Sequence, residues 1–187
     1  MLMIKICGIT RREDALAAAE AGASAIGFVF YPHSPRYVTP EKAAEMGDGI
    51  AIEKVGVFVD ETPATIETAM KSANLDIAQI YGDNLPVHGR IWRAVRVAAG
   101  RALEIDRQAE AILLDGAANG LSFDWRIARG AAKKVIVAGG LDASNVGDAI
   151  RAAEPWGVDA SSRLESSPGI KDHEKMRRFI RAAQECA

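Results

Sequence analysis

Near its start the chain contains Met3-Ile4-Lys5-Ile6-Cys7-Gly8-Ile9-Thr10, the pattern of a strand that a tight turn joins to a helix. Apolar Ile4 and Ile6 alternate with Lys5 and Cys7, so a strand here places the lysine and the thiol on one face. A thiol at the end of a strand is a candidate acid–base group or nucleophile, although cysteines more often fill buried space.

The residues after this strand favour a turn and then a helix. Gly8 lets the chain leave the strand without a side chain beside the sulfur. Thr10 and Glu13 fit a capping box and predict a helix over 11–21.

The same pattern of strand and helix recurs along the chain and predicts parallel βα units. Thr39-Pro40 and Thr62-Pro63 each combine an N-cap with a proline at the first helical position. The connection over 82–89 is too short for a helix of ordinary length. We expect strands over 3–7, 25–30, 54–60, 76–81, 91–97, 111–115, 134–140 and 157–162, and helices over 11–21, 41–46, 63–72, 101–110, 123–132, 143–153 and 172–184.

Eight such units in 187 residues predict one compact (β/α)₈ TIM barrel over 1–187, with a trimmed fourth connection. A doubly wound sheet would more often have five or six strands and a G-x-G-x-x-G turn after the first. The first turn here is Cys7-Gly8-Ile9-Thr10, which lacks that fingerprint. In a barrel, the chemistry lies at the carboxyl ends of the strands.

Composition limits the classes of partner. The formal net charge is -2, with 49% hydrophobic and 26% charged residues. No global field therefore favours nucleic acid or an anionic membrane, and we expect neither as a partner. Two cysteines at opposite ends of the chain form no disulfide framework, and no stretch resembles a signal peptide or a membrane span, so we expect a cytoplasmic protein.

The ends of the seventh and eighth strands indicate a phosphate site. Gly139-Gly140 lets the backbone approach an anion, and Ser161-Ser162 supplies hydroxyl donors. Either pair alone could simply end a strand or cap a helix. Their position on the last two strands, where barrels often bind phosphate, favours the binding role.

Three further polar residues are candidates on the remaining strands and loops. Asp115 ends the sixth strand as a possible acid, or as a turn aspartate. Arg36 lies in a proline-rich loop, where its guanidinium could form a bidentate hydrogen bond to a substrate carboxylate or remain solvated. Gln79 would point into the barrel near its mouth, either toward a ligand or as a satisfied core amide.

Two other features of the pattern concern charge. We predict that Asp159 pairs with Lys5 inside the barrel, because a buried lysine needs a partner. The three histidines, His33, His88 and His173, are scattered, so we expect no metal site.

Motifs over nearly the whole chain resemble those of the phosphoribosylanthranilate isomerase family of tryptophan biosynthesis. The resemblance implies a (β/α)₈ barrel and a cofactor-free Amadori rearrangement of N-(5-phosphoribosyl)anthranilate, a small phosphorylated sugar, to 1-(2-carboxyphenylamino)-1-deoxyribulose 5-phosphate. It also implies that Cys7 is the general base, Asp115 the general acid and Arg36 the ligand of the anthranilate carboxylate. The motifs occupy 5–10, 27–31, 34–38, 55–59, 113–115, 123–125, 138–141, 157–159, 161–162, 168–169 and 171–172.

Some residues depart from that family pattern. Tyr81 stands where the family usually has histidine, Arg163 stands where it prefers glycine, and the loop over 117–122 is shortened. Two other functions therefore stay open: a degenerate barrel that binds a phosphorylated ligand with little turnover, and the related histidine-pathway aldose-amine isomerase. The second family generally has aspartate at the position of Cys7, which argues against it. For the oligomeric state we expect a monomer or a homodimer.

Overall fold

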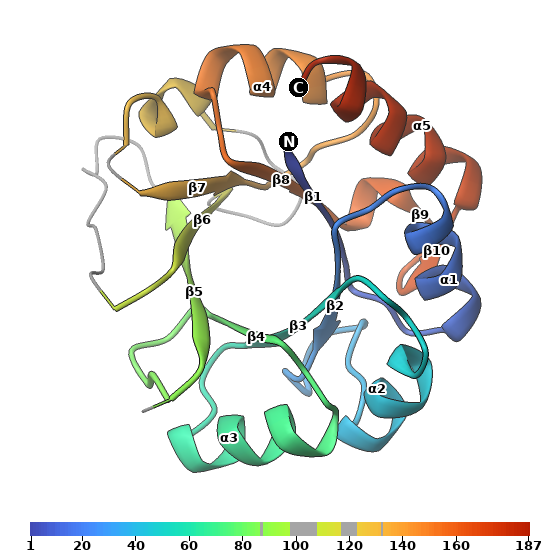
Figure 1. Cartoon of the computed structure of the whole chain (residues 1–187), viewed down its shortest axis with the longest axis vertical. Helices are drawn as coiled ribbons and strands as arrows, with labels where there is room; N and C mark the ends of the chain where they lie inside the picture. Colours follow the sequence, from blue (N-terminus) through green and yellow to red (C-terminus); the bar gives the residue numbers. More distant parts are fainter. Residues whose placement is uncertain (87, 98–107, 117–122, 132) are drawn as a thin grey trace.

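Eight parallel strands close into a barrel in the computed structural model, which describes residues 1–86, 88–97, 108–116, 123–131 and 133–187 (Figure 1). Each strand pairs with its successor in the chain, and β8 pairs back with β1. This confirms the predicted (β/α)₈ barrel. The strands are β1 (Met3–Cys7), β2 (Ala25–Val29), β3 (Glu53–Phe58), β4 (Ile77–Ile80), β5 (Arg90–Val97), β6 (Ala111–Gly116), β7 (Lys134–Val137) and β8 (Gly157–Ala160).

Helices surround the strands on the outside of the ring (Figure 1). Thr39 and Thr62 accept hydrogen bonds from the backbone N–H groups of Lys42 and Thr65, which confirms both predicted caps. Among the described residues no helix is long and apolar enough to cross a bilayer. The helices are α1 (Arg12–Glu20), α2 (Pro40–Gly47), α3 (Pro63–Ser72), η1 (Trp125–Ala128), α4 (Val146–Ala153), η2 (Ser162–Leu164) and α5 (His173–Glu185), and a hairpin of β9 (Glu165–Ser167) and β10 (Ile170–Lys171) precedes α5.

The capping box predicted for the first helix is wrong. The N-cap of α1 is Arg11, which makes no side-chain capping hydrogen bond. The Thr10 hydroxyl instead donates to the carbonyl oxygen of Gly169, between β9 and β10. The threonine therefore ties the exit of β1 to the last hairpin, a long-range partner that no local pattern could reveal.

The later units differ from the prediction in extent. The helix expected over 123–132 is only the short η1 within the described residues, and α4, which was expected from residue 143, begins at Val146 with Asn145 as its N-cap. In the turn before α4, Asp142 accepts hydrogen bonds from the backbone N–H and hydroxyl of Ser144. Most of the helix expected over 101–110, and the loop over 117–122, lie outside the described residues. The trimmed fourth connection is confirmed, since the described residues between β4 and β5 contain no helix.

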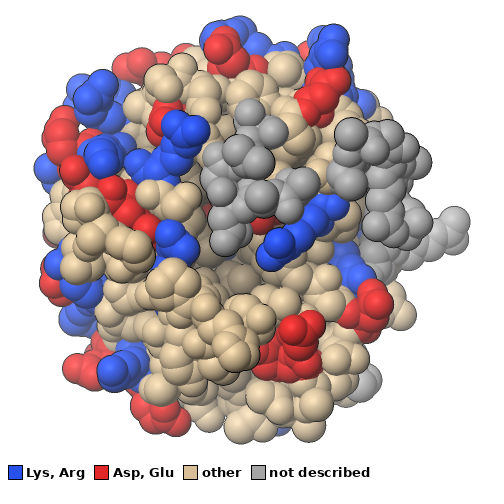
Figure 2. Space-filling model, turned by 180° about the vertical axis from the view of Figure 1, so that it is seen from behind, with Lys and Arg blue, Asp and Glu red and all other residues tan. Residues whose placement is uncertain are grey.

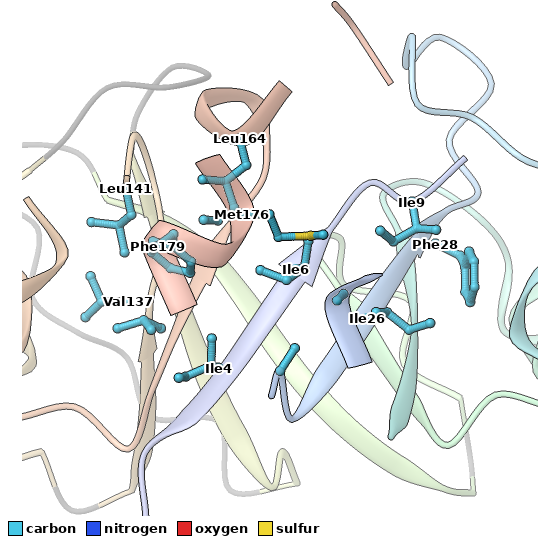
Figure 3. Close-up of a cluster of buried hydrophobic side chains, with 14 of the residues drawn as sticks. Ile4, Ile6, Ile9, Ile26, Phe28, Val137, Leu141, Leu164, Met176 and Phe179 are labelled. Atoms are coloured by element: carbon cyan, nitrogen blue, oxygen red, sulfur yellow. The ribbon is translucent and has the colours of Figure 1, made fainter. Parts of the chain in front are cut away.

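The two faces of each strand pack differently. Ile4 and Ile6 point outward and pack with Met176 and Phe179 of α5 in the cluster that Figure 3 shows. Inside the barrel, a second cluster surrounds the fully buried Trp92 at the amino-terminal end of the strands. Nearer the carboxyl ends, the residues that line the barrel include the polar Cys7, Gln79, Asp115 and Asp159. The mouth of the barrel is therefore more polar than its amino-terminal end.

The predicted ion pair between Lys5 and Asp159 is confirmed. The two residues lie opposite each other in the register of β1 and β8, and Lys5 Nζ donates to Asp159 Oδ1 at 3.0 Å. The lysine side chain is 0% exposed and the aspartate 8%. Burial alone would lower the pKa of Lys5, but Asp159 and Cys7 raise it above its ordinary value.

We expect Asp159→Ala to lower the free energy of unfolding by about 3–5 kcal/mol, because it leaves a lysine buried without its partner. Urea unfolding followed by circular dichroism measures the loss. The double variant Lys5→Met/Asp159→Leu is the control, since replacing both charges by apolar groups restores most of the stability. A single variant as stable as the wild type contradicts the account.

Candidate active site

A cavity of about 250 Å³ lies at the carboxyl ends of the barrel strands. Glycines and serines after β7 and β8 form one side of it, and the loop after β2 forms another. Seen from one side of the molecule, basic and acidic side chains are interspersed over the surface (Figure 2). All the residues predicted for the site line the cavity: Cys7, Arg36, Gln79, Asp115, Gly139, Gly140, Ser161 and Ser162.

Cys7 is the last residue of β1 and is 8% exposed. Its neighbour in the register is Gly27 of β2. A Cβ at Gly27 would lie only 2.9 Å from Cys7 Sγ and 3.2 Å from Lys5 Nζ, so glycine makes the room in which thiol and ammonium meet. Burial raises the pKa of Cys7 above its ordinary value, and the nearby Lys5 offsets this only in part.

Asp115 lies near the end of β6 and also faces the cavity. Its Oδ2 accepts a hydrogen bond from the Tyr81 hydroxyl at 3.0 Å. Burial raises the pKa of Asp115, although the Tyr81 hydrogen bond, the backbone of Gly116 and the charge of Arg96 act in the opposite direction. The neutral carboxylic acid therefore persists to higher pH than in a free aspartate.

Loop arginines are often solvated, but Arg36 is mostly buried and forms an ion pair with Glu165. Its Nε and Nη2 donate to the two oxygens of Glu165, both at 2.7 Å, and Lys171 Nζ donates to Glu165 Oε1 at 2.9 Å. A Cβ at Gly8, whose φ is +75°, would lie 2.6 Å from Arg36 Cδ, so glycine also admits the arginine stem. Although burial opposes it, Arg36 and Lys171 lower the pKa of Glu165, which is therefore a carboxylate.

The other predicted residues line the cavity from β4 and from the segments after β7 and β8. Gln79 is 1% exposed, and its Oε1 has no partner among the described residues. Gly139 and Gly140 follow β7 with φ of +85° and +66°, so they lie beyond the strand that was expected to contain them. Ser161 and Ser162 likewise follow β8.

Sequence reasoning missed several residues of this site. Glu165 and Lys171 lie in the last hairpin, and only the fold shows that Glu165 forms buried ion pairs with both Arg36 and Lys171. Arg96 lies two residues after Ala94 on β5, so both side chains face the barrel interior, and this spacing is the sequence signal that could have found Arg96. Tyr81 and Arg163 were noted only as departures, yet both line the cavity, and Arg163 Nη1 lies 3.3 Å from Asp142 Oδ2.

Comparison with known proteins points to one family. Residues 4–182 match the family model described as N-(5'phosphoribosyl)anthranilate (PRA) isomerase. The N-(5'-phosphoribosyl)anthranilate isomerase of Solibacter usitatus is 49% identical over 195 residues, covering 98% of each chain.

Solved structures agree with the sequence match. The phosphoribosyl anthranilate isomerase of Thermus thermophilus superposes with a TM-score of 0.91 at 33% identity and covers 100% of both chains. A phosphoribosyl anthranilate isomerase in complex with reduced 1-(o-carboxyphenylamino)-1-deoxyribulose 5-phosphate has a TM-score of 0.87 at 36% identity, over 99% of this chain and 100% of the other.

Proposed function

Because the chain belongs to the N-(5'-phosphoribosyl)anthranilate isomerase family, we propose that Asp115 and Cys7 catalyse its reaction as general acid and general base. The chain is a phosphoribosylanthranilate isomerase of tryptophan biosynthesis, and its ligand is a small phosphorylated molecule. The observation that supports the assignment of roles is that a carboxyl from β6 and a thiol from β1 line the same cavity.

Asp115 acts first. Its neutral carboxyl gives a proton to the ring oxygen of the ribose, the bond from that oxygen to C1 breaks, and the anilino nitrogen supplies the electron pair of the resulting iminium. Burial raises the pKa of this carboxyl, which favours the protonated form that the step requires.

Cys7 acts second. As a thiolate it removes the proton from C2, and the electron pair of that C–H bond neutralises the iminium to give an enolamine, which becomes the ketone by tautomerisation. The iminium charge and the adjacent Lys5 both favour the thiolate that this step requires. Asp115 ends as a carboxylate and Cys7 as a thiol, and proton exchange with water restores both.

The remaining residues bind the ends of the substrate. The phosphate can accept hydrogen bonds from two groups of donors. These are the backbone N–H groups around Gly139 and Gly140 and the hydroxyls of Ser161 and Ser162. Glu165 occupies one edge of the Arg36 guanidinium, which leaves the edge formed by Nη1 and Nη2 for the anthranilate carboxylate. Gln79 Oε1, which has no partner among the described residues, can accept a hydrogen bond from a sugar hydroxyl.

We expect Arg36→Lys to raise KM about 10- to 100-fold, with a smaller change in kcat, because lysine cannot bind two carboxylates with a planar fork. Steady-state kinetics over a range of substrate concentrations measures the effect. Arg129→Lys, in an exposed ion pair with Glu154, is the control. An unchanged KM in Arg36→Lys removes the arginine from the substrate site.

The direct test of the function is the loss of fluorescence as phosphoribosylanthranilate is consumed by the purified protein. Turnover that depends on Cys7 and Asp115 supports the assignment, whereas binding without turnover would favour the degenerate barrel. Preference for the histidine-pathway aldose amine in a parallel assay would favour the other isomerase. For the compartment we propose the reducing cytoplasm, since both cysteines are free thiols.

A further inference from the structure

Tyr81 directly follows β4 and is fixed at both ends. Its backbone N–H donates to the carbonyl oxygen of Phe58 at 3.0 Å, and its hydroxyl donates to Asp115 Oδ2 at 3.0 Å. The Arg96 guanidinium lies 5.7 Å from the centre of the ring, within the range of a cation–π contact. The hydroxyl is therefore presented to Asp115 in one orientation.

We propose that Tyr81 is a positioning residue for the general acid, holding Asp115 so that Oδ1 carries the proton that the substrate receives. The inference rests on the proposed role of Asp115. It assigns to the side chain of Tyr81 a task in the reaction although that side chain transfers no proton itself.

The position of the acid proton follows from the direction of the hydrogen bond. Burial and the facing carboxyl of Asp115 hold the pKa of Tyr81 well above its usual range, so the phenol keeps its proton and remains a donor. The oxygen that accepts this hydrogen bond behaves as the carbonyl oxygen of the neutral carboxyl group. The acid proton therefore resides on the other oxygen, Oδ1.

The same hydrogen bond contributes more as the reaction proceeds. When Asp115 gives up its proton, negative charge develops on the carboxylate, and a hydrogen bond donated to an ionised acceptor is stronger than one to a neutral acceptor. An interaction that is stronger in the transition state than in the ground state lowers the activation free energy of the reaction. Tyr81 thus makes Asp115 a better acid as well as an oriented one.

Other charged and titratable groups also face Asp115 and must be unchanged in any test. Arg96 comes from β5 and Lys5 from β1, and both favour the carboxylate form. Asp159 of β8 acts in the opposite direction, and its interaction with Asp115 is repulsive. Cys7 of β1 faces Tyr81 across the same cavity.

The experiment removes one oxygen atom. In Tyr81→Phe we expect kcat to fall about 10- to 100-fold, the size of a lost hydrogen bond to a charged group, with KM nearly unchanged. We also expect the Asp115 carboxyl to titrate at higher pH. Infrared difference spectroscopy of the substrate-free protein measures that titration, and the band is assigned by its loss in Asp115→Asn. Tyr37→Phe, at a residue that is 41% exposed, is the matched control.

The readouts separate the inference from the roles on which it rests. A fall in kcat without a shift in the Asp115 titration overturns the inference, because it indicates a packing role, and so does a shift with unchanged kcat. Neither outcome affects the general acid itself. Only near-normal turnover in Asp115→Asn, measured in the same assay, removes Asp115 from catalysis and the inference with it. Thermal unfolding followed by circular dichroism verifies that each variant is folded.

Discussion

Cys7→Ala is expected to lower kcat by at least about 10²- to 10⁴-fold, the usual contribution of a well-placed general base. Without the thiolate no side chain at this position can remove the C2 proton, so ring opening is no longer followed by rearrangement. The cavity keeps its other lining residues, and KM should change much less than kcat. Single-turnover kinetics and fluorescence measure the effect.

Cys186 offers a matched control for this variant. It is the second free cysteine of the chain and lies at the end of α5, away from the barrel mouth. Cys186→Ala should therefore retain wild-type turnover. If Cys7→Ala and Cys186→Ala had the same kcat, the thiol of β1 would have no place in the reaction.

Asp115→Asn should reduce kcat by a similar factor, about 10²- to 10⁴-fold, for the complementary reason. An amide has nearly the shape of the carboxyl group and can still accept the Tyr81 hydrogen bond, but it has no acidic proton to give to the ring oxygen. The loss should therefore appear in kcat, with an intact fold by circular dichroism.

The control for this second variant is Asp148→Asn, at an exposed aspartate that pairs with Arg151 on α4. Its turnover should match the wild type. Near-normal activity of Asp115→Asn would assign the proton donation to another group.

The parity of short strands explains how much of the site could be predicted. Alternation of Ile4 and Ile6 with Lys5 and Cys7 is enough to place lysine and thiol inside the barrel, and closure of β8 on β1 then brings Asp159 to Lys5. The proline-containing caps at Thr39 and Thr62 are local signals and were also predicted correctly.

Some contacts could not be predicted because the two partners are distant in the chain. Thr10 has the local pattern of a cap but hydrogen-bonds to Gly169, and Arg36 depends on Glu165, 129 residues later. Propensity and spacing describe neighbours within a few residues, so they cannot supply such partners. The same limit applies to Tyr81, whose hydroxyl is important only because Asp115 is opposite it.

The ion pair that seals the barrel has a consequence for synthesis. Lys5 and Asp159 are 154 positions apart, so Lys5 leaves the ribosome long before its partner exists. At about 5–20 residues per second, roughly 8 to 30 s separate the translation of the two codons. During that interval the ammonium group remains hydrated and β1 has an unpaired edge, so the nascent chain cannot complete its interior until the last strand emerges.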